Sequence, residues 1–239
     1  IMALDIYCGS LGRYYAHNWC NIEEQKTKGK EPGIEGERMT ELCNLPISAE
    51  ETGEVVLQWK EYITGQIQAH HNCPVDWAED LNGDYATDRL SWENFGALII
   101  WALHVEMGRK APLHRLGEDW DWTKEPVYRK YVDEKDYKPH YSAIITGPQL
   151  SLPVDVPFTF TAQCPSGKVI PMASSLRQHE QLLELNEARW KATPEEILSW
   201  KETYKDASIL EERAKQAYSV YYALSNFCME HNVPMMLVF

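Results

Sequence analysis

The sequence predicts an α+β fold: one domain over residues 1–239, with a small mixed or antiparallel sheet packed against about five or six α-helices. Three observations lead to this prediction. Both ends of the chain are strand-like, a hairpin-like segment lies near residues 154–172, and several helical segments open with capping signals. Hydrophobic residues make up 44% of the chain and charged residues 25%, the balance of an ordinary globular protein.

The first strand is predicted at 4–7, where apolar and polar residues alternate, and the turn at 8–10 ends it. A short helix should follow over 11–15. The segment 23–47 is charged and carries scattered glycine and proline without periodicity, which predicts a surface loop.

Two helices are predicted before residue 110. Ser48 and Glu51 have the spacing of a capping box, and the apolar residues that follow recur at helical intervals to about His70: Val56, Trp59, Ile63 and Ile67. The second helix begins near Ser91, and its apolar run over 95–103 predicts a buried, central position. The segments 71–89 and 108–139 are polar or turn-rich and predict loops.

The second half of the chain predicts the rest of the sheet. Alternation from Val154 to Phe160, a turn at 165–168 and a return strand from Val169 indicate a hairpin, irregular near its two prolines. Three helices should follow, opening near 175, 193 and 208. The apolar segment 235–239 predicts a final strand beside the first strand or the hairpin.

Charge and cysteine content exclude several classes of function. The net charge of −13 comes without a Lys/Arg cluster, so nucleic-acid and anionic-membrane binding are not expected. The longest apolar run is far shorter than the ~18 residues of a membrane span, and no basic leader with an apolar core is present. The six cysteines are scattered, without a Cys-x-x-Cys pair, and predict buried thiols. A cytoplasmic location is therefore expected.

The turn from Cys8 to Arg13 is where an enzyme would have its anion-binding site. It joins a strand to a helix, where anion-binding loops often lie, and Ser10 and Arg13 would be the residues that hold an anion. The spacing is Cys-x4-Arg and not the Cys-x5-Arg of a phosphatase loop. The common hydrolase and dinucleotide motifs are absent. A plain tight turn is the other interpretation.

No metal or cofactor is predicted. His70, His71 and Cys73 are the densest group of soft ligands, but adjacent positions usually point apart. Asp80, Asn82, Asp84 and Asp88 have the spacing of part of a calcium loop, which lacks the glycine and the final glutamate that an EF-hand needs.

Acidic and aromatic residues are interleaved between residues 76 and 122, where ten acidic residues stand against four basic ones. Such a surface attracts a basic partner at long range and anchors it through aromatic side chains. The alternative is that the tryptophans cover the core while the acids face water. The predicted partner-binding residues are Asp80, Asp84, Asp88, Glu118, Asp119, Trp120, Asp121 and Trp122.

In general character, the chain is similar to the immunity proteins that accompany bacterial polymorphic toxins, which are often acidic, rich in aromatic residues and free of catalytic motifs. This resemblance implies a non-enzymatic protein that neutralises a basic toxin by occlusion. Two alternatives stay open: a small enzyme with an anion site at Cys8 to Arg13, and a structural interaction module.

Overall fold

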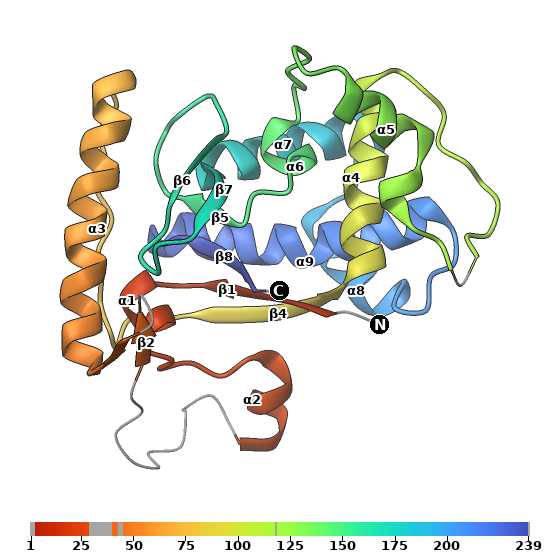
Figure 1. Cartoon of the computed structure of the whole chain (residues 1–239). Coiled ribbons are helices and arrows are strands. Elements are labelled where there is room, and N and C mark those ends of the chain that lie inside the picture. The colour runs from red at the N-terminus through yellow and green to blue at the C-terminus, as the bar shows by residue number, and fades with distance from the viewer. Residues whose placement is uncertain (1–2, 29–39, 43–44, 118, 239) are drawn as a thin grey trace.

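A computed structural model describes residues 3–28, 40–42, 45–117 and 119–238 (Figure 1). Its strands are β1 (Ala3–Cys8), β2 (Thr40–Leu42), β3 (Leu45–Ile47), β4 (Ala86–Ser91), β5 (Leu150–Leu152), β6 (Phe160–Gln163), β7 (Val169–Ser174) and β8 (Met235–Val238). Its α-helices are α1 (Leu11–Tyr15), α2 (Ile22–Lys28), α3 (Ala49–His70), α4 (Trp92–Glu106), α5 (Pro126–Asp133), α6 (Ser142–Ile145), α7 (Ser175–Arg189), α8 (Pro194–Thr203) and α9 (Leu210–His231), and a short 3₁₀ helix, η1, covers Trp122–Lys124.

Six strands form one mixed sheet in the order β4-β1-β8-β5-β7-β6. Neighbouring strands are antiparallel except β5 and β7, which are parallel. The strands β2 and β3 pair separately. The first and last strands are direct neighbours, with Ile6 opposite Leu237, which confirms the α+β prediction and the prediction that the two ends share a sheet.

The sheet separates two apolar clusters, and alternate residues of its strands enter different clusters. Leu4 and Ile6 of β1 pack in the larger cluster, to which α4, α7, α8 and α9 contribute. Tyr7, between Ile6 and the turn, packs in the smaller cluster with residues of α1 and α3. Helices therefore cover both faces of the sheet. In Figure 1, α3 lies at the left of the molecule, on the same side as β6.

The predicted long helices are confirmed, with small shifts at their starts. Both halves of the Ser48–Glu51 capping box form at the start of α3. Ser174, one residue earlier than predicted, caps α7. The capping signal at Ser208 is wrong: α9 begins at Leu210 and its first turn has no side-chain cap.

Several short elements were not predicted from the sequence. The helices α2, α5 and α6 are eight residues or shorter, so the described residues hold nine α-helices and not five or six. The strand β4 lies largely in the segment predicted as loop, and β5 lies in the region from Gln149 to Met172 that is predicted as strand-like but was not predicted as a strand of its own. The hairpin is shorter than predicted, because residues 154–159 are irregular. Within the described ranges, no helix is long and apolar enough to cross a membrane.

Candidate functional site

The turn after β1 is built to hold a loop. The hydroxyl of Ser10 caps α1 by accepting from the backbone N–H of Arg13 at 3.2 Å, and it donates to the backbone carbonyl of Asp80 at 2.5 Å. Ser10 is 4% exposed. Its hydrogen-bonding capacity is therefore used to fix the start of α1 against the loop that precedes β4.

Arg13 serves the same loop. Its side chain is 5% exposed; Nε donates to the carbonyl of Asn18 at 2.6 Å and Nη1 donates to the carbonyl of Gly83 at 2.5 Å. The guanidinium also lies 4.3 Å from the ring centre of Tyr85. Because these donors already bind carbonyls, the geometry does not favour the anion site considered for Ser10 and Arg13: both residues fasten the 79–85 loop to α1.

This fastening creates a groove. A cavity of about 370 Å³ lies between α1, the first half of α3 and the loop before β4. We call it the acidic groove; its lining consists of Gly12, Glu50, Gly53, Glu54, Leu57, Glu79, Asp80, Leu81 and Asn82. Four of these nine residues are acidic and none is basic.

Glu79 is the deepest acid of the groove. One carboxylate oxygen accepts from the backbone N–H of Gly12 at 2.8 Å, and the other accepts from the indole N–H of Trp77 at 2.7 Å. Burial raises the pKa of Glu79 above its usual value, and the two hydrogen bonds act in the opposite direction. The carboxylate is therefore held in one orientation at the groove wall.

Two glycines let α1 and α3 approach closely at the groove. A Cβ on Gly12 would lie 3.3 Å from Cδ2 of Leu81 and 4.0 Å from the backbone of Gly53. A larger residue at position 12 would push the loop away from α1. The groove therefore depends on small residues at the point where the two helices cross.

The remaining groove residues combine charge with apolar surface. Glu50, Glu54 and Asp80 are exposed, and Leu57 is 47% exposed, high for a leucine. The nearby Lys60 does not line the groove: its ammonium donates to the carbonyl of Trp77 and lies 4.8 Å from the Trp77 ring centre. The groove thus presents acidic side chains around two leucines, a combination that suits the long stem and charged head of Lys or Arg.

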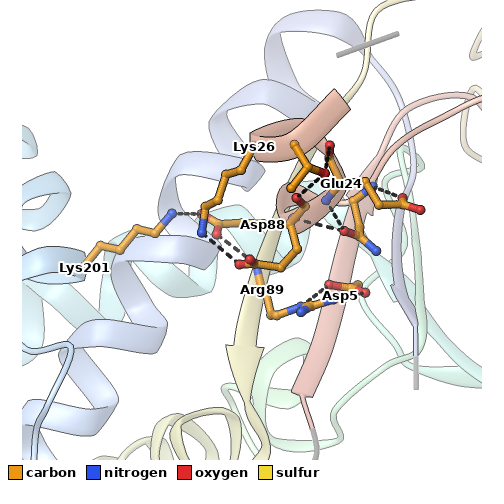
Figure 2. Close-up of polar contacts among 9 residues, drawn as sticks. Asp5, Glu24, Lys26, Asp88, Arg89 and Lys201 are labelled. Atoms are coloured by element: carbon orange, nitrogen blue, oxygen red, sulfur yellow. Dashed lines mark hydrogen bonds and ion pairs between the residues drawn. The ribbon is translucent and has the colours of Figure 1, made fainter. Parts of the chain in front are cut away.

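The structure divides the predicted partner-binding residues. Asp80 lies in the groove, and Asp84 is exposed two residues after its last lining residue. Asp88 lies elsewhere, on β4, where its carboxylate contacts Lys201 of α8 at 2.5 Å, beside the bidentate pair of Arg89 with Asp5 (Figure 2). Asp88 is thus already paired with a cation of the same chain.

The second predicted segment behaves differently. Glu118 lies outside the described residues. Asp119 is exposed, and Trp120 is half-buried, with its indole N–H donating to Glu125 at 2.6 Å. Asp121 caps η1 by accepting from the backbone N–H and the hydroxyl of Thr123, and these bonds lower its pKa.

Trp122 corrects the prediction most clearly. It is 5% exposed and packs directly on α4, so closely that a Cβ on Gly96 would overlap the Trp122 ring. The Trp92 ring centre lies 5.0 Å away. A side chain this buried offers no surface to a partner, so Trp122 is not an anchor in this conformation. Trp77, the tryptophan nearest the groove, is 1% exposed and is excluded for the same reason.

The two acidic segments do not form one surface. The groove lies at the α1 and α3 end of the sheet, whereas η1 lies beside α4 and α5 at the other end (Figure 1). The six residues of β4 run between them, a span of roughly 20 Å. Only the first segment contributes to the acidic groove.

Sequence reasoning missed Glu50, Glu54, Leu57 and Glu79. The first three follow one another at spacings of four and three residues, so they share one face of α3. That face lies away from the apolar face of Val56 and Ile63, so the spacing of these residues could have indicated an exposed acidic face from the sequence alone. The position of Glu79 depends on contacts to Gly12 and Trp77, which no local pattern reveals.

Among the described residues, no group of three or more His, Cys, Asp or Glu side chains is arranged to hold a metal ion. Comparisons with protein-family models, with curated proteins and with solved structures found no match for this chain. The interpretation of the groove therefore rests on its own geometry.

Proposed function

We propose that this chain is a non-enzymatic binding protein that holds a basic protein partner at the acidic groove, and that it neutralises that partner, a toxin, by covering its active site. The observation that carries the proposal is the lining of the groove, with four carboxylates and two leucines and no basic residue. A cleft lined by one sign of charge concentrates the field that steers an oppositely charged partner.

The proposed contact is a Lys or Arg side chain of the partner inserted into the groove. Its methylene stem would pack on Leu57 and Leu81, and its charged head would meet Glu79 and Asp80. Because two hydrogen bonds already orient the Glu79 carboxylate, binding loses little side-chain entropy there. The net charge of −13 adds attraction at long range.

The test compares two double variants of equal charge change. Glu50→Gln with Glu54→Gln alters the groove, whereas Glu61→Gln with Glu230→Gln alters exposed acids outside its lining. Binding is measured by surface plasmon resonance, first with an arginine-rich peptide and its citrulline counterpart, then with the partner that co-purifies from the native host.

We expect the groove variant to slow association about tenfold at low salt, and the control variant to slow it much less. Equal effects of the two variants would show that binding follows net charge and not the groove. A co-purified partner that binds the chain but retains its toxic activity in the complex would contradict neutralisation by occlusion.

A further inference from the structure

A second cavity lies on another side of the fold, at the end of α4. It has a volume of about 230 Å³ and is lined by Trp101, His104, Val105, Arg109, Lys110, Ala111, Leu113, Arg189 and Glu211. We call it the α4 cavity. None of its lining residues belongs to the acidic groove.

The end of α4 brings the cations to this cavity. Gly108 has a φ of +61°, a left-handed conformation that lets the chain turn sharply after the helix. The backbone N–H of Arg109 then donates to the carbonyl of His104 at 2.8 Å. Further along, the backbone N–H of Leu116 donates to the carbonyl of Ser208 at 2.7 Å and ties the segment to the start of α9. The position of Arg109 and Lys110 is thus fixed by backbone contacts.

Three cations surround the cavity without acidic partners. Within the described residues, the side chains of Arg109, Lys110 and Arg189 form no ion pair or hydrogen bond. Three cations therefore lie around one cavity and produce a local positive potential there.

The acids close to the cavity are already engaged. Glu211, the one acidic lining residue, accepts from the indole N–H of Trp190 at 3.0 Å and pairs with Lys215 at 3.1 Å. Glu125, whose charge acts on His104, accepts from Trp120 at 2.6 Å. These contacts weaken the repulsion that an incoming anion would meet.

Trp101 and Val105 contribute apolar surface to the lining of the cavity. Trp101 is 8% exposed, and both its Nε1 and the Nδ1 of His104 are buried without a hydrogen-bond partner among the described residues. Leu113, at the rim, is 78% exposed, an unusually open position for a leucine.

We propose that the α4 cavity binds a small organic anion, namely a carboxylate on a single aromatic or aliphatic ring. The carboxylate meets Arg109 and Arg189, and the ring lies against Trp101 and Val105 beneath Leu113. The cavity of about 230 Å³ has room for one ring with one acid group. Arginine is the side chain that best matches a carboxylate, because its guanidinium donates two parallel hydrogen bonds.

The test uses benzoate and its uncharged counterpart benzamide with the whole chain, and measures dissociation constants by ligand-observed NMR. Benzoate should bind at least about tenfold more tightly than benzamide, since hydrogen bonds to a charged group are the stronger kind. This comparison needs no variant. Inorganic phosphate should bind more weakly than benzoate, because it makes no ring contact.

Variants then locate the site. Arg109→Gln and Arg189→Gln should each weaken benzoate binding about tenfold. The matched control, Arg129→Gln, changes an exposed arginine of α5 outside the cavity and should leave binding nearly unchanged. Equal affinity for benzoate and benzamide, no binding of either, phosphate binding as tight as benzoate, or retained affinity in both cavity variants would overturn the proposal.

Discussion

Two acidic and aromatic segments of similar composition take different roles in this fold. In the segment before β4, the acids Glu79 and Asp80 line an open groove, while Trp77 lies beneath it. In the segment around η1, Asp121 caps a helix and Trp122 fills the space above Gly96. The tryptophan is buried in both segments, so the difference lies in the acids: they line a groove where the loop is fastened to α1, and they cap a short helix where the chain packs on α4.

The largest expected effect concerns Trp122 and Gly96. Trp122→Ala should lower the free energy of unfolding by about 3–5 kcal/mol, because it empties a large buried site. Gly96→Ala should also destabilise strongly, since its Cβ overlaps the ring. The double variant should cost less than the sum, because the methyl group added at position 96 occupies part of the space that the Trp122 ring leaves. Urea unfolding measures all three.

The control for the variants at positions 96 and 122 is Gly65→Ala in the middle of α3. A Cβ there meets nothing within 4 Å, so the substitution should stabilise by about 0.5–1 kcal/mol through helix propensity alone. Strictly additive losses at positions 96 and 122 would mean that the two residues do not share one space, and the explanation for the burial of Trp122 would fail.

A smaller effect separates the roles of Asp121 and Asp80. Asp121→Ala should lower stability by about 1 kcal/mol through loss of the cap, and leave the binding of an arginine-rich peptide unchanged. Asp80→Ala should slow association with that peptide severalfold at low salt, through the field of the groove. If instead Asp80→Ala lowered stability and Asp121→Ala slowed peptide association, the roles assigned to the two segments would be wrong.

The smallest effect is a pH dependence of the groove. Because the folded-state pKa of Glu79 is raised, this carboxylate takes up a proton at a higher pH than an ordinary glutamate. Peptide affinity should therefore begin to fall while the pH is still above 4.5, the usual glutamate value. The same raised pKa affects folding in the other direction. The contribution of Glu79 to the free energy of unfolding is greatest below its unfolded-state pKa and declines as the pH rises through its folded-state pKa.

Glu79→Gln tests this assignment. As the pH is lowered, peptide affinity of the variant should no longer fall in the range in which Glu79 takes up its proton. It should still fall at lower pH, where the exposed acids are protonated. A profile that is identical in the variant and the parent chain would mean that Glu79 does not titrate in the range that the burial predicts.

The sequence allowed prediction of those elements whose signals are local. The capping boxes at Ser48 and Thr193 give helix starts that the structure confirms, because both halves of each box lie within four residues. The strand β4 was missed because its sequence, ATDRLS, does not alternate clearly. Its extended form is stabilised by pairing with β1 and by the contact of Arg89 with Asp5, more than eighty residues earlier (Figure 2).

The same limit applies to the candidate site. The sequence pointed to Asp80 and to the strand-to-helix turn, but it could not show that Ser10 and Arg13 reach across to hold the loop. It also could not decide between an exposed Trp122 and one that covers the core, because the space above Gly96 arises only when α4 and η1 come together. Local patterns therefore located the acidic loop, and long-range packing decided which of its residues face solvent.

The position of β8 has a consequence for the order of folding. In the sheet, β8 is the strand that joins the β4–β1 pair to the β5–β7–β6 group. It comes after all of them in the chain and pairs Asp5 with Val238. On a ribosome, the two halves of the sheet are thus made long before the strand that connects them, and closing so distant a contact is slow. The edges of β1 and β5 that pair with β8 therefore stay unpaired during synthesis until β8 emerges.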